Sequence, residues 1–232
     1  MSKALRFYAF LFLVAAFSVS VAVPGYSQDD MDVKSKMMDT GKQMMCPGPS
    51  SATSACALRK VLNLLLAEHV YLGAMATNAA LNGNQKEFEA AAAALDLNSQ
   101  ALAAANGSVY GQAAADAFLP LWRKHIGFLV DYTQAVAAGD AAKKQKAMDD
   151  LNAYAADFAA FIHSASPSLP VDAVTALVQE HGKTFLLVID DQAAGDDAKA
   201  FIDTRMAAAH MQAIADAHAE AIVQQFPDKF QN

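Results

Sequence analysis

The sequence predicts an all-α protein of three repeated antiparallel helical hairpins, about six helices in all, packed as a bundle or a short solenoid. The first observation is a fixed period, because His69, His125 and His181 follow one another at intervals of 56 residues. Each histidine also precedes a glycine by 14 residues, at Gly83, Gly139 and Gly195. A period of this length indicates one supersecondary unit repeated three times, with the apolar face of each unit covered by the others.

Apolar side chains within each repeat return every three or four residues, which is the spacing of a helix packed along one face. In the first repeat this stripe contains Leu62, Leu65, His69 and Leu72. Breaks rich in glycine, asparagine, serine or proline, one of them at 106–108, separate the periodic segments. The predicted helices span 55–81, 85–106, 113–138, 141–165, 171–194 and 197–225.

The N-terminal part of the chain has a different composition from the repeats. Residues 1–27 have the pattern of a secretory signal, with Lys3 and Arg6 before an apolar stretch. Residues 28–54 are predicted to form a flexible, Met-rich arm, 55–226 the helical-hairpin domain and 227–232 a C-terminal tail. We therefore expect export to the periplasm or the cell exterior, where Cys46 and Cys56 are expected to form a disulfide.

Charge and motifs exclude several classes of function. The formal net charge is −7, and the basic residues are not clustered as a nucleic-acid surface requires. No second apolar run is long enough to cross a bilayer once the signal is removed. The sequence contains no nucleophile elbow, phosphate loop or zinc-protease motif. These observations favour a non-enzymatic protein that binds a small ligand or a protein partner of the envelope or matrix.

The three periodic histidines lie inside the apolar stripes, so they should be buried and should each need a hydrogen-bond partner or a metal. Counting along the returning helix of each hairpin places one residue level with each histidine. These level residues are Asn98, Tyr154 and His210, each 15 residues after a turn glycine. Asparagine and tyrosine are natural partners for a core histidine, whereas the third hairpin places histidine opposite histidine.

The third hairpin is therefore the first candidate for a metal site. His181 and His210 face each other there, and Met206, Met211 and His218 lie nearby in the sequence. Imidazole suits copper, zinc and iron, and thioether sulfur favours monovalent copper, so copper is the candidate metal. The Met-rich arm would add soft ligands of the same kind.

A second set of ligands combines one histidine from each repeat. Their equal distance from the turns would bring His69, His125 and His181 to one height if the hairpins packed around an approximate threefold axis. Three imidazoles with an open fourth position form a known geometry for zinc or copper. A solenoid would exclude this site, because its repeats do not converge on a common axis.

Four stretches resemble a family of exported bacterial helical-repeat proteins, some of which are labelled copper-amine-oxidase-like. These stretches are AEHVYLGAMATNAAL, NGSVYG, LWRKHIGFLVDYT and AAAHMQAIA. The resemblance covers about residues 57–222 and implies export and internal repetition, but no reaction. The chain does not resemble the catalytic domain of a copper amine oxidase, which is a large β-rich enzyme with a modified tyrosine.

Together these patterns predict an exported, non-enzymatic binding protein with copper as the candidate ligand. The alternative is a structural or protein-interaction module of the envelope or extracellular matrix that binds no metal.

Overall fold

The computed structural model describes residues 53–231. The predicted signal at 1–27, almost all of the predicted arm at 28–54 and Cys46 of the expected disulfide lie outside the described residues. Within the described part, no helix is long and apolar enough to cross a membrane.

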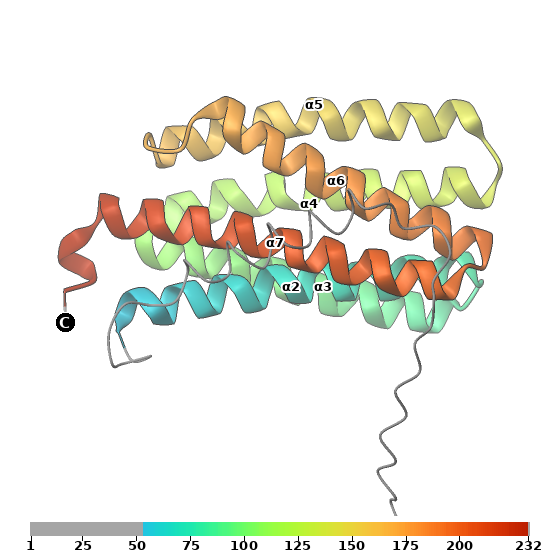
Figure 1. Cartoon of the computed structure of the whole chain (residues 1–232), viewed down its shortest axis with the longest axis horizontal. Helices are drawn as coiled ribbons and strands as arrows, with labels where there is room; N and C mark the ends of the chain where they lie inside the picture. The colour runs from blue at the N-terminus through green and yellow to red at the C-terminus, as the bar shows by residue number, and fades with distance from the viewer. Residues whose placement is uncertain (1–52, 232) are drawn as a thin grey trace, which may run out of the picture. The chain divides into compact units, whose positions relative to one another are not determined.

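Six long helices make up the described domain, and no strand occurs in it, as the sequence predicts (Figure 1). They are α2 (Ser54–Leu81), α3 (Gln85–Tyr110), α4 (Gln112–Ala137), α5 (Ala141–Ala165), α6 (Val171–Ala194) and α7 (Asp197–Gln225). A short 3-10 helix, η1 (Pro227–Lys229), follows at the end. The predicted helix boundaries agree with these closely, except at the end of α3.

The helix α3 runs through the break that the sequence predicts at 106–108 and ends at Tyr110, just before Gly111, whose φ is 93°. Gly107 lies inside the helix, where a Cβ atom would stand 2.9 Å from the Cβ of Ala115 in α4. The glycine therefore permits a close approach of two helices. Sequence reasoning took it for a helix break because glycine serves both purposes.

The helices close into a ring. Each helix packs against the next along the chain, and α7 returns to pack against α2. The first helices of the three hairpins, α2, α4 and α6, also contact one another, so they form the centre of the bundle. Because a solenoid would leave its first and last helices apart, the closed ring excludes that alternative.

Side chains 56 residues apart meet at the centre of the ring. One apolar cavity of about 140 Å³ is lined by two such sets, Leu62, Phe118 and Val174 together with Leu66, Trp122 and Val178. Another set consists of Gly73, Leu129 and Phe185, where the missing side chain of Gly73 makes room for the Phe185 ring. The repeat therefore builds the core as layers, each with one residue from every hairpin.

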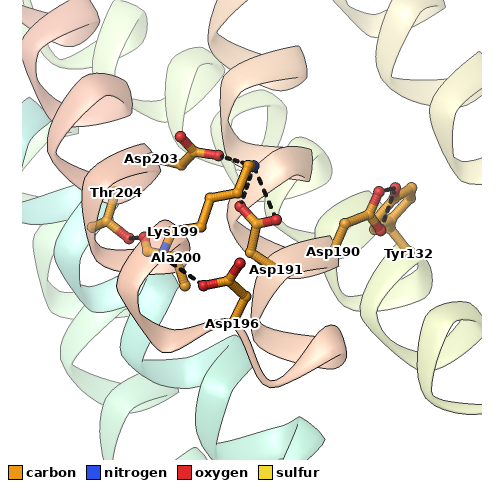
Figure 2. Close-up of polar contacts among 8 residues, drawn as sticks. All are labelled: Tyr132, Asp190, Asp191, Asp196, Lys199, Ala200, Asp203 and Thr204. Atoms are coloured by element: carbon orange, nitrogen blue, oxygen red, sulfur yellow. Dashed lines mark hydrogen bonds and ion pairs between the residues drawn. The ribbon is translucent and has the colours of Figure 1, made fainter. Parts of the chain in front are cut away.

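The hairpin turns repeat as well. The turn glycines Gly83, Gly139 and Gly195 all have φ between 64° and 72°, a conformation that glycine adopts without strain. Asp196 caps α7 by accepting a hydrogen bond from the backbone N–H of Lys199. The Lys199 ammonium group lies between the carboxylates of Asp191 and Asp203 and joins the two helices of the third hairpin (Figure 2).

The Gly73–Phe185 contact predicts opposite effects for two Gly→Ala substitutions in helix interiors. Gly73→Ala should destabilise the protein by about 1–3 kcal/mol, because the new methyl group would stand 2.9 Å from Cζ of the fully buried Phe185. Gly127→Ala should stabilise it by about 0.5–1 kcal/mol, because Gly127 is exposed and has open space around it. Urea unfolding of both variants measures the difference, and equal stabilities would contradict this description of the central layer.

Candidate metal centre

One layer of the core consists of the three periodic histidines. His69 of α2, His125 of α4 and His181 of α6 are all buried, with exposed fractions of 2, 4 and 7%. One ligand nitrogen from each ring lies within 4.8 Å of the other two. The alternative set from the sequence is therefore brought together around one point, and this group could hold a metal ion.

The spacing of two of these nitrogens fits coordination. Nε2 of His69 and Nε2 of His125 are 3.3 Å apart. Two imidazole nitrogens bound to one tetrahedral zinc ion at about 2.0–2.1 Å are separated by about 3.3–3.4 Å. A weak N–H···N hydrogen bond has a similar length, so the distance alone does not distinguish the two arrangements. A hydrogen bond joins only two rings, whereas a ligand nitrogen of the third histidine also lies within 4.8 Å of the other two.

The Nδ1 atoms of all three histidines are buried and make no well-aligned hydrogen bond within residues 53–231, although the backbone of Trp122 interacts with the His125 ring. Because a buried, unpaired polar atom costs about 1–3 kcal/mol, a layer of three such rings is expensive to maintain in an apolar core. The histidine contacts within this layer do not compensate for that cost. Coordination of an ion by the Nε2 atoms would offset this cost with its own binding energy, while the Nδ1 atoms would stay unpaired.

Burial also keeps these rings neutral. Desolvation is the main cause that lowers the pKa of His125 and His181 to about 3. Neighbouring imidazoles act in the same direction, and the backbone of Trp122 partly opposes the shift of His125. The pKa of His69 is lowered well below its usual value for the same two reasons. Neutral imidazole is the form that coordinates a metal, so the core holds the ligands ready at neutral pH.

Aromatic rings enclose the histidine layer. The Trp122 ring lies 4.6 Å from that of His125 and 5.0 Å from that of His69, measured between centroids. Phe185 lies against His181, and Tyr154 stacks on His125. Sequence reasoning did not assign Trp122 to the site, although its place three residues before His125 puts it in the adjacent layer. Trp122 is the only tryptophan of the chain, so its fluorescence can report on the centre.

The predicted partners of the histidines are adjacent but bond differently from expectation. Asn98 donates to the carbonyl of Leu65 and to the carboxylate of Glu68, and its own Oδ1 has no partner within residues 53–231. Tyr154 stacks on His125, and its hydroxyl is likewise unpaired within that range. The predicted hydrogen bonds from His69 to Asn98 and from His125 to Tyr154 are therefore wrong. Counting residues from the turn glycine predicted how far along the helix Asn98 and Tyr154 lie. It did not predict the direction in which their polar atoms point.

The members of the first metal set lie in different surroundings. His210 is near His181, but its Nε2 is 2.9 Å from the carbonyl oxygen of Leu177. His218 lies eight residues further along α7, about 12 Å away by helix rise, and its Nε2 is 2.8 Å from Oδ1 of Asn106. Met211 is buried, whereas Met206 is 39% exposed. Only His181 of this set belongs to the histidine layer.

A cavity of about 340 Å³ lies beside the layer, between α4, α5 and α6. His125 and His181 both line it, together with Tyr154 and several aliphatic side chains. Nothing in the periodicity indicated this space, because it depends on how three helices pack side by side.

No protein-family model matches this chain, and neither a curated protein nor a solved structure matches it. The resemblance to exported helical-repeat proteins therefore remains an expectation from the sequence. The chemistry of the centre has to be inferred from its own geometry.

The buried histidines predict that the metal-free protein loses stability in mild acid. Their folded pKa values, about 3 for His125 and His181 and about 4 for His218, lie below the unfolded value of about 6.5. The unfolded chain therefore binds more protons between those limits, so stability is complete above pH 6.5 and falls as the pH drops toward 4. The loss should reach several kcal/mol, a large part of the net stability of a domain.

Urea unfolding of the metal-free protein at intervals from pH 8 to pH 4 measures this loss. A variant with leucine at the three layer positions should show a much shallower decline, because His218 would be the remaining strongly shifted histidine. A free energy of unfolding that stays constant from pH 7 to pH 4.5 would contradict the prediction.

Proposed function

We propose that this protein is an exported, non-enzymatic binding protein for a transition-metal ion, with copper as the preferred metal and His69, His125 and His181 as its ligands. The observation that supports it most directly is the convergence of three buried imidazoles, one from each repeat, on one point. Copper and zinc both accept imidazole ligands.

The position of the histidines argues for a ligand. The layers on either side of them consist of apolar residues and glycine, such as Leu66, Trp122 and Val178 on one side, where the indole Nε1 of Trp122 is also unpaired within residues 53–231. Apolar residues at the histidine positions would continue that packing without unpaired nitrogens, and replacement of buried polar groups by apolar ones of similar shape is often neutral or stabilising. A layer retained at such a cost is more readily explained by binding than by folding.

The charge of the centre favours monovalent copper over a divalent ion. None of the three ligands is anionic, so the full charge of the ion would remain inside an apolar core. The cost of burying an ion rises with the square of its charge in the Born description, which makes a single charge far less costly than two. Zinc sites built from thiolates or a carboxylate reduce that charge, and this layer has neither.

Export and the lack of enzymatic activity are inferred from the sequence. The signal pattern at 1–27 supports export, and the Met-rich segment that follows offers thioether ligands suited to monovalent copper. The resemblance to exported helical-repeat proteins agrees with this location.

The second candidate function is a protein-interaction module, and one surface favours it. Tyr71 and Met75 of α2 and Phe201 of α7 are 47, 53 and 73% exposed, and they line a hollow of about 430 Å³. Large apolar side chains gathered at one place on a surface are typical of contact sites. This function would leave the histidine layer without a role, and metal binding distinguishes the two.

Purified protein should bind close to one equivalent of monovalent copper under anaerobic conditions, and binding should change the fluorescence of Trp122 because its ring touches two of the ligands. Leucine in place of any one of His69, His125 and His181 should weaken copper binding by at least 100-fold, because two neutral ligands hold the ion less well than three. Competition with a chromogenic copper chelator gives the affinities, and parallel titration with zinc tests the preference.

The matched controls are His218→Gln and Met206→Leu, which change a buried histidine and a methionine outside the layer. Both should retain the affinity of the unchanged protein. Copper binding that survives all three layer substitutions and is lost with Met206 and His218 would overturn the assignment of the ligands. A protein that binds neither copper nor zinc would favour the interaction module.

A further inference from the structure

We infer that the cavity between α4, α5 and α6 is a binding chamber for a small, neutral and largely apolar molecule, which presents one nitrogen, sulfur or carbon donor atom to the ion. This inference rests on the proposed function, since it assigns the partner that the metal centre receives. It begins from a departure of the third repeat from the other two.

Gly182 lines the cavity and directly follows His181. The equivalent positions, 56 and 112 residues earlier, are occupied by Ile126 and Val70, both apolar side chains. Val70 is fully buried, and Ile126 packs partly buried against the core. The third repeat therefore lacks a packed side chain next to its histidine.

Neither packing nor backbone conformation requires this glycine. A Cβ atom added to Gly182 would have no neighbour within 4 Å, and the residue does not have a positive φ. Glycine inside a helix costs about 0.5–1 kcal/mol relative to alanine, so Gly182 lowers the free energy of unfolding of the protein. The structural consequence of the missing side chain is open space beside a metal ligand.

The walls of the cavity indicate the kind of molecule that fits. Leu129, Met148, Leu151 and Leu186 supply an apolar lining, while His125 and His181 stand on its inner side. A volume of about 340 Å³ is at the lower end of the range for small-molecule sites. A compact molecule would fit if its apolar body packed against the aliphatic side chains and its one donor atom faced the histidines.

A buried hydroxyl in the wall has no hydrogen-bond partner among the described residues. Tyr154 is 3% exposed, and its hydroxyl makes no hydrogen bond within residues 53–231. A phenol hydroxyl can donate one hydrogen bond. Because an unpaired buried hydroxyl is costly, a ligand that accepts its hydrogen bond would gain affinity.

Two charged residues line the wall, and both are paired. The ammonium group of Lys183 lies 3.4 Å from the carboxylate of Glu180. Asp190 accepts hydrogen bonds from the hydroxyl of Tyr132 and from the ammonium group of Lys144, at 2.8–3.1 Å. Figure 2 shows the carboxylate of Asp190 turned toward Tyr132. This pairing leaves no free charge of Asp190 for a ligand, which favours a neutral molecule over an ionic one.

The test uses tert-butyl isocyanide, a neutral molecule with an apolar body and a single donor atom that binds monovalent copper. The copper-loaded protein should bind it with a shift of the isocyanide stretching band, measured by infrared spectroscopy during titration. Gly182→Ile, which restores the residue of the second repeat, should weaken this binding at least tenfold while the copper content stays the same. Gly182→Val should give an intermediate loss and serves if the isoleucine variant does not fold.

Gly127→Ile is the matched control, since Gly127 is also a helix-interior glycine with open space around it, two residues from a ligand but outside the cavity. It should bind the isocyanide like the unchanged protein. Copper uptake without isocyanide binding, or equal binding by the Gly182 variants, would overturn the chamber and leave the metal proposal intact. A protein that takes up no copper would overturn both.

Discussion

The closure of the ring between α7 and α2 is the contact on which the site depends. Without it, the repeats would extend along a line, and residues 56 apart would lie far from one another. With it, α2, α4 and α6 share a centre, and each set of equivalent residues becomes a layer. Arg59 reinforces this closure from α2 through an ion pair with Asp216 of α7, and Asn63 donates to the same carboxylate. The histidine layer is thus a product of topology as much as of residue type.

Much of the fold followed from the sequence because it rests on local patterns. The apolar spacing, the turn glycines and the caps each act within a few residues, and the helices α2, α4, α5, α6 and α7 begin and end close to the predicted positions. Gly107 was misread because its role depends on a neighbouring helix, namely on the position of Ala115 in α4. Local chemistry cannot tell a glycine that ends a helix from one that admits another helix.

The clustering of the three periodic histidines was predicted only as an alternative, for a related reason. The period places His69, His125 and His181 at one height, but the direction in which they point depends on whether the hairpins close into a ring. The preferred set around His210 relied on sequence proximity to Met206 and Met211, whereas the Nε2 of His210 lies against a backbone carbonyl. The contacts of Trp122 and the cavity beside His181 could not be found without the packing of neighbouring helices, which for the cavity are α4, α5 and α6.

The layered core also explains why one repeat can differ without loss of the fold. Each layer needs a roughly constant volume, and Gly73 opposite Phe185 shows that a large residue in one repeat can be offset by a small one in another. Gly182 breaks this rule, because no side chain from another helix fills the space that it leaves. Its neighbour His181 therefore combines a place in the symmetric layer with access to an asymmetric cavity. A threefold repeat brings three equivalent imidazoles together, and one local departure from that symmetry accompanies a cavity on one side of them.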